Sequence, residues 1–377
     1  MKKYLFFFAL SLSLFLVHAI YTRHALYGDG NGYYVTSLSL LTEGTFKADP
    51  VINYLQNFPG RDYVFSRVFW DPAHNPYSVG TSLAWLPALA LTSVFSGNPF
   101  DLWHELAPGL TGIILMLAGL YFLEQYLRHF FSAKSVSATT LALFFGSNVF
   151  YYTALEPALS HQLAFFLIAF LLSWTYNFRY SPLRLVALGI LFGLLHITRI
   201  SDTLLLLPIF LLLKWDVPKL WLLGLGIIVG VAPQMAAQAY YYESVTRNFY
   251  VTESSNQWSF RLVHLFEYLF SYQKGLFIWS PLYLLGVSGL LKMKKYLILA
   301  TILALWLLGS FWSAHSSMTA GFGQRLAFAA VPYFGIGIAY LYDRLTPAER
   351  HLMTGLFVGW NTFLLYGFYI LKWKNLS

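Results

Sequence analysis

The chain has 377 residues, of which 58% are hydrophobic and 11% are charged, whereas a soluble globular protein carries about 25% charged residues. Its net charge is +8, but Lys and Arg occur mostly as ones and twos between apolar stretches, which excludes the continuous basic patch of a nucleic-acid-binding protein. The absence of Cys excludes disulfides and thiolate metal sites. We therefore expect an all-α, polytopic integral membrane protein in which residues 1–377 form a single transmembrane domain.

Apolar segments suited to crossing a bilayer recur along the whole chain, since a hydrocarbon core of roughly 30 Å requires about 20 apolar residues per helix. They predict about eleven transmembrane helices. The first resembles a secretory signal peptide, with two lysines before its apolar core. Because the rest of the chain also spans, we expect this helix to be retained. The predicted spans are roughly Tyr4 to Tyr21, Trp103 to Leu123, Val136 to Tyr152, Ser160 to Tyr176, Leu183 to Ile197, Thr203 to Leu213, Leu220 to Tyr240, Leu276 to Leu291, Tyr296 to Trp312, Leu326 to Leu341 and Leu352 to Leu371.

The cations between these segments predict the orientation. With the amino terminus in the cytoplasm, the turns that carry most Lys and Arg residues all face the cytoplasm, as the positive-inside rule requires. The agreement depends on the apolar stretch 81–95 not crossing, so we expect a re-entrant or interfacial helix there, interrupted by Pro87. Two long extracytoplasmic loops then cover residues 22–80 and 241–274.

Several acidic residues and a histidine lie on the predicted outer side. Asp29 stands between two glycines directly after the first helix, where glycine permits a positive φ and a close approach of the backbone to a ligand. A turn capped by Asp and Asn is the alternative reading. Asp71 also reads as a solvated loop acid, Glu156 as a helix cap, and His161 as a buried, hydrogen-bonded histidine.

Three cations lie on the outer side, against the general pattern: Arg199, Lys274 and Arg325. Ionisable groups at this depth face a cavity or a partner, and an ion pair between Arg199 and Asp202 is the structural explanation for the first. Three external cations together favour an anionic ligand, and phosphate is the natural candidate. Contact with phospholipid headgroups is the alternative.

Four segments resemble those of the GT-C-fold membrane glycosyltransferases, which use polyprenyl-phosphate-linked sugars. The similarity is to a bacterial branch of the superfamily of protein mannosyltransferases and aminoarabinose transferases, and it covers most of the chain. In that family an acid after the first helix is catalytic, and long external loops follow the first and seventh helices. The segments are Asp29-Gly-Asn-Gly-Tyr-Tyr34, Tyr77-Ser-Val-Gly-Thr-Ser-Leu-Ala-Trp85, Trp279-Ser-Pro281 and Phe322-Gly-Gln-Arg325.

The resemblance implies an inverting transfer of a sugar from a polyprenyl-phosphate donor to an envelope lipid, polysaccharide or protein. The active site would face the periplasm or exterior, with the protein in a bacterial inner membrane among its lipids. Asp29 would be the general base that takes the proton of the acceptor hydroxyl. Arg199, Lys274 and Arg325 would stabilise the departing phosphate. The further substrate-binding candidates are His161, Tyr33 and Tyr34.

The chain departs from the better-known members at the position of a second acid, where it has Gly30 and Asn31. No metal or other cofactor is therefore predicted, although Asp71 or Glu156 would be the residues to complete a divalent-metal site. The alternative function is a transporter or flippase of a lipid-linked or anionic substrate, but transporters place ionisable groups near the midplane and often contain internal repeats. A non-catalytic partner in envelope synthesis is a third reading.

Overall fold

The computed structural model describes residues 2–46, 75, 77–96, 101–213, 219–247, 258–312 and 321–369. Within these ranges the chain is helical, apart from turns and one isolated bridge between Trp258 and Trp312. The predicted all-α class is therefore confirmed for this part of the chain.

Four helical segments of the described chain are long and apolar enough to cross a membrane, as an integral membrane protein requires. They are α1 (Lys2–Thr22), α6 (Leu102–Leu127), α12 (Leu220–Tyr242) and the continuous pair η4 (Arg325–Ala330) with α19 (Val331–Tyr342).

A second group of helices is apolar but shorter. Its members are α5 (Gly80–Phe95), α7 (Ala133–Phe145), α9 (Ser160–Thr175), α10 (Pro182–Thr198), η1 (Ile200–Leu206) joined to α11 (Leu207–Leu212), α16 (Leu282–Lys292) and α17 (Tyr296–Phe311). The remaining helices are α2 (Asp29–Thr42), α8 (Val149–Ala154), α14 (Leu262–Phe270), α15 (Leu276–Trp279) and α20 (Pro347–Tyr369).

Every one of the eleven predicted spans contains helix, but some of them are broken. The span predicted from Leu276 to Leu291 is an example: α15 ends at Trp279, and α16 begins only at Leu282, after Ser280 and Pro281. Proline lacks the N–H that would continue the hydrogen-bond ladder. Residues 81–95 form α5, which continues through Pro87. Eleven crossings, and the re-entrant or interfacial placement of α5, stay predictions.

Both predicted outer loops contain a helix that the hydropathy pattern does not predict. The first contains α2, in which Tyr33, Tyr34, Val35 and Leu38 are buried. The Tyr33 ring meets the Trp85 ring of α5 edge-on, with centroids 5.9 Å apart. The second contains the short helix α14. Tertiary burial, rather than intrinsic helix propensity, explains α2, whose first turn is rich in glycine.

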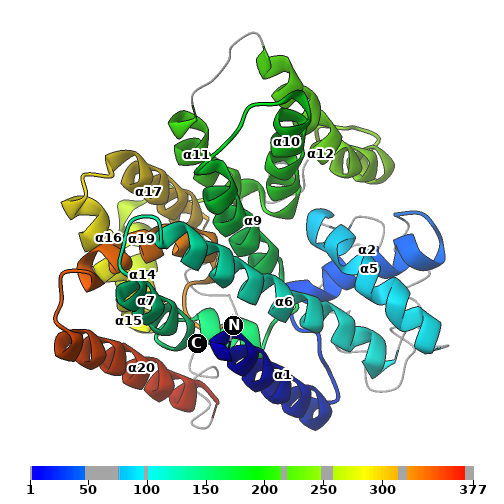
Figure 1. Cartoon of the computed structure of the whole chain (residues 1–377). Helices are drawn as coiled ribbons and strands as arrows, with labels where there is room; N and C mark the ends of the chain where they lie inside the picture. Colours follow the sequence, from blue (N-terminus) through cyan, green and yellow to red (C-terminus); the bar gives the residue numbers. More distant parts are fainter. Residues whose placement is uncertain are drawn as a thin grey trace.

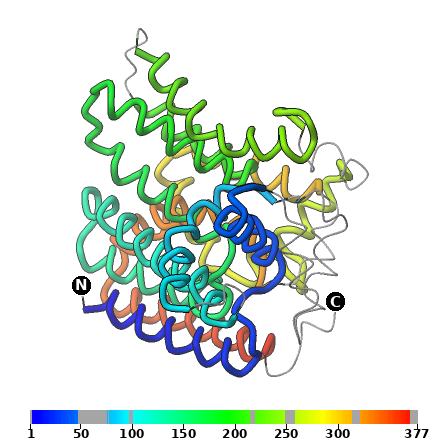
Figure 2. The backbone as a smooth tube through the Cα atoms, turned by 90° about the vertical axis from the view of Figure 1, so that its right-hand side faces the viewer, coloured from blue at the N-terminus to red at the C-terminus, as the bar shows by residue number. Residues whose placement is uncertain are grey.

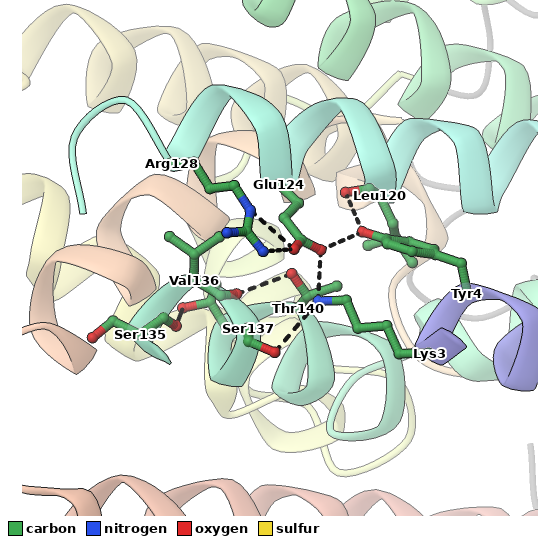
Figure 3. Close-up of polar contacts among 10 residues, drawn as sticks. Lys3, Tyr4, Leu120, Glu124, Arg128, Ser135, Val136, Ser137 and Thr140 are labelled. Atoms are coloured by element: carbon green, nitrogen blue, oxygen red, sulfur yellow. Dashed lines mark hydrogen bonds and ion pairs between the residues drawn. The ribbon is translucent and has the colours of Figure 1, made fainter. Parts of the chain in front are cut away.

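The first helix belongs to the bundle and runs antiparallel to α6. Near its start, the Lys3 Nζ lies 2.6 Å from Oε2 of Glu124, and the Tyr4 hydroxyl donates to the same oxygen at 2.6 Å (Figure 3). One turn further on, the Phe7 ring stacks on Phe144 with centroids 4.1 Å apart. Helices α1 and α20 lie on the lower side of both overall views (Figures 1 and 2). Retention of the first helix stays a prediction.

Three turns with predicted cytoplasmic cations lie together with the amino terminus, and we call this region the basic end. Glu124 joins the start of α1 to Arg128 after α6. The Ser132 amide donates to Asp343 at 3.1 Å, which joins the turn after α6 to the turn after α19. Lys294, in the turn after α16, and Phe130, in the turn after α6, both line one cavity, so these two turns are also neighbours. These three turns and the amino terminus therefore lie close together, and their cytoplasmic orientation stays a prediction.

Candidate functional site

Asp29, expected in a loop, is the first residue of α2. An acid in the first turn of a helix is stabilised by the positive end of the helix dipole. Gly28 precedes it with φ 51°, in the left-handed region that favours glycine. At Gly30, an added Cβ would lie 2.5 Å from the Ala158 carbonyl oxygen. Glycine therefore allows the start of α2 to pack directly against the turn before α9, which fixes the position of the Asp29 side chain.

The carboxylate of Asp29 forms an ion pair with Arg325, the first residue of η4. Its Oδ2 lies 3.0 Å from Nη2 of Arg325, and the two side chains are 27% and 15% exposed, respectively. The Tyr77 hydroxyl donates to the other carboxylate oxygen at 3.5 Å, the long limit for such a bond. Three distant segments thus meet at a carboxylate that remains accessible. The sequence predicted two of these residues and placed both on the outer side.

Lys274 contributes a second cation near this pair. It lies in the turn between α14 and α15 and is partly buried. Burial, and secondly the positive charge of Arg325, lowers the pKa of Lys274 to about 8, because both disfavour the protonated amine. The ammonium therefore loses its proton as the pH rises through about 8. Two of the three cations predicted to bind an anion, Lys274 and Arg325, are therefore close enough in the structure to interact electrostatically.

Glu156 and His161 occupy different surroundings. The charges of Glu156 and Arg325 both act on the Tyr152 hydroxyl, so Glu156 belongs to the same electrostatic cluster as Asp29. His161 is 1% exposed. Its ring contacts those of Tyr152 and Phe328, with centroid distances of 5.8 and 6.0 Å. The structure thus places His161 inside a buried aromatic cluster, which confirms the burial expected of this residue.

Arg199 is engaged in a buried network behind α2. Its Nε donates to Oδ2 of Asp202 at 3.0 Å, and its Nη1 donates to the Ser160 hydroxyl at 3.3 Å. The Tyr33 hydroxyl donates to the same Ser160 oxygen at 3.1 Å. Burial, followed by the charge of Asp29, raises the pKa of Tyr33 to about 12, so this phenol stays protonated. The ion pair with Asp202 is the structural alternative considered for Arg199. Through Ser160 and Tyr33, the whole network joins the end of α10 to α9 and α2.

The remaining predicted residues lie away from this cluster or beyond the described chain. Tyr34 is 1% exposed and packs in an apolar group with Trp85 and Leu89. Asp71 lies outside the described residues. Among the residues that the structure does describe, no three His, Asp or Glu side chains come together as a metal site.

Tyr77, Tyr152 and Ser160 were not singled out in the sequence as site residues. Tyr77 lies in one of the segments that carry the family resemblance, which is the one available indication of a role. Tyr152 and Ser160 have no distinctive sequence context, because their positions beside Arg325 and Arg199 depend on how distant helices pack.

Comparison of the chain with known protein families, curated proteins and solved structures found no match. The chemistry of the site must therefore be read from its own residues. An accessible carboxylate that pairs with Arg325, near the cation of Lys274, can accept a proton while the cations bind an anion. Asp29, Arg325 and Lys274 form what we call the carboxylate–cation site, with Tyr77 and Glu156 at its border.

Proposed function

We propose that the protein is an inverting membrane glycosyltransferase that moves a sugar from a polyprenyl-phosphate donor to an acceptor in the cell envelope. The acceptor is a hydroxyl group of a lipid, polysaccharide or protein. The observation that supports this proposal is the ion pair between Asp29 and Arg325 with Lys274 nearby. We further propose that the carboxylate–cation site faces the periplasm or exterior of a bacterial inner membrane.

In the proposed reaction, the acceptor oxygen attacks the anomeric carbon of the sugar from the side opposite the phosphate. The bond between that carbon and the phosphate oxygen breaks, and its electron pair leaves with the lipid phosphate. The acceptor proton passes to Asp29. One carboxylate suffices because phosphate is a good leaving group, whereas the alcohol released in glycoside hydrolysis needs an acid as well.

The cations Arg325 and Lys274 would stabilise the charge that develops on the leaving phosphate. Arginine binds phosphate through two parallel N–H donors, so the donor phosphate would compete with Asp29 for Arg325. Binding of the donor would then release the carboxylate from its ion pair. Asp29 would become available as a base when the substrate arrives.

The substitution Asp29→Asn tests the proposed base. It keeps the size of the side chain but removes its capacity to take a proton, and we expect sugar transfer to fall by about 1,000-fold, within the range for general bases. The measurement is the incorporation of labelled sugar from polyprenyl-phosphate donor into membrane lipid or polysaccharide. Asp343→Asn is the matched control, because Asp343 lies at the basic end beside Ser132, and it should leave transfer unchanged.

Unchanged incorporation by Asp29→Asn would contradict the assignment of the base. The transporter or flippase alternative predicts a different result in proteoliposomes. The parent protein would then move a lipid-linked sugar across the bilayer without forming a glycosidic bond.

A further inference from the structure

A cavity of about 200 Å³ lies at the basic end, between the turn after α6, the helix α11 and the start of α17. Figure 1 shows α11 and α17 on the same side of the molecule. None of the residues that line it belongs to the carboxylate–cation site. Residues that line it include Phe130, Leu212, Lys294, Lys295 and Tyr296.

The wall of this cavity is apolar and open to the surroundings. Phe130 is 49% exposed, Leu212 is 67% exposed and Tyr296 is 62% exposed. Because the chain contains helices of membrane-spanning length, exposed aliphatic side chains such as Leu212 can contact lipid acyl chains. Aromatic side chains are enriched at the level of the lipid headgroups. The cavity therefore fits a ligand with a long apolar part.

Two lysines stand at one side of the same cavity, and its described lining contains no carboxylate. Lys294 has φ 55°, an uncommon backbone conformation for a residue other than glycine. Glycine is the usual residue just after a helix end of this kind. At this position the chain has Lys294 in place of the usual glycine. The turn therefore carries two adjacent exposed ammonium groups, those of Lys294 and Lys295.

We propose that this cavity binds a phospholipid with an anionic headgroup. The acyl chains lie against Phe130 and Leu212, and the phosphate and the rest of the headgroup contact Lys294 and Lys295. Charge complementarity favours this occupant, because a zwitterionic lipid brings a quaternary ammonium close to the two lysines. A small soluble anion would leave the apolar wall unused. The proposal does not depend on the proposed glycosyl transfer.

The test compares lipids of identical acyl chains on the full-length protein after delipidation in detergent. Native mass spectrometry measures the binding of phosphatidylglycerol and of phosphatidylcholine. We expect phosphatidylglycerol to bind at least about tenfold more tightly. The double substitution Lys294→Gln with Lys295→Gln should weaken its binding about 25-fold, because each lysine near a membrane surface contributes about fivefold.

Lys134→Gln is the matched control, since Lys134 is an exposed lysine at the start of α7 and does not line the cavity. It should change the affinity by less than about twofold. Leu212→Asp introduces a carboxylate into the cavity and leaves both lysines in place, and it should cause a loss similar to that of the double substitution. An equal loss in the control, equal binding of phosphatidylcholine, or displacement of the lipid by millimolar inorganic phosphate would each overturn the proposal.

Discussion

Two of the carboxylates that pair with arginine, Asp29 and Glu124, lie in very different surroundings. Glu124 is 3% exposed. One of its oxygens accepts from Arg128 at 2.5 and 3.2 Å, and the other from Lys3 and Tyr4 at 2.6 Å each. Among the residues that the structure describes, Asp29 has a single short contact, with Arg325, and its side chain is 27% exposed. Both oxygens of Glu124 thus have short contacts within the protein, whereas Asp29 remains accessible and has fewer partners in the described part of the chain.

This difference distinguishes the structural carboxylate of Glu124 from Asp29, which is a candidate catalytic residue. A buried carboxylate with every lone pair occupied contributes to stability and cannot easily exchange its partners. A partly exposed carboxylate with one strong partner can release that partner to a ligand. Formal charge alone would not distinguish them, because both are acids close to arginine.

Replacing each carboxylate by alanine gives the largest expected contrast. Glu124→Ala should lower the free energy of unfolding by about 3 kcal/mol, because it leaves Lys3, Tyr4 and Arg128 without their shared acceptor. Asp29→Ala should lower it by less than about 1 kcal/mol, as for an accessible ion pair. Unfolding in mixed micelles with increasing sodium dodecyl sulfate measures both. Equal losses would remove the distinction drawn between the two carboxylates.

The arginine partners give the next contrast. Arg325→Gln should reduce sugar transfer by about 100-fold, because it removes a charge that stabilises the leaving phosphate. Arg128→Gln removes the same charge at the basic end and should change transfer by less than about twofold. The labelled-sugar assay on folded protein checks both variants. If Arg128→Gln is as damaging as Arg325→Gln, the effect is on the fold rather than on the reaction.

The smallest effect concerns pH. Lys274 is protonated below its pKa of about 8 and neutral above it, so its stabilisation of phosphate is present at pH 7 and lost as the pH rises. We expect transfer to fall by about tenfold between pH 7 and pH 9. Lys274→Arg keeps its charge throughout this range, and it should remove most of the fall. A variant that retains the parent's pH profile would exclude Lys274 from the reaction.

The fold was predictable to the extent that hydropathy determines it. The apolar runs located the helices, because each run of this length must satisfy its backbone hydrogen bonds internally in a membrane. The helix α2 was not predictable in the same way. Its first turn contains Gly30 and Gly32, and local propensity therefore favours a turn. The contact of Gly30 with Ala158 stabilises the helix, and such contacts depend on segments that are distant in sequence.

The site was predictable in its charges but less so in its pairings. Asp29 stood out because it lies between two glycines directly after the first helix, and Lys274 and Arg325 stood out because they oppose the charge pattern of the outer side. Arg199 stood out for the same reason, yet its ion pair is with Asp202, three residues later. Glu124 attracted no attention, since an acid near a helix end can simply face water. Only the packing of α1 against α6 reveals it as a buried acceptor.

The spacing of Glu124 and Arg128 also matters for the order in which the protein is synthesised. The two side chains are four residues apart on one helical face, so α6 carries its own counter-ion when it leaves the ribosome. The helix can therefore enter the lipid phase with its glutamate already neutralised. Lys3 and Tyr4 then complete the cluster when α1, inserted earlier, meets α6. The pair within α6 thus compensates the Glu124 carboxylate independently of whether α1 has packed against it.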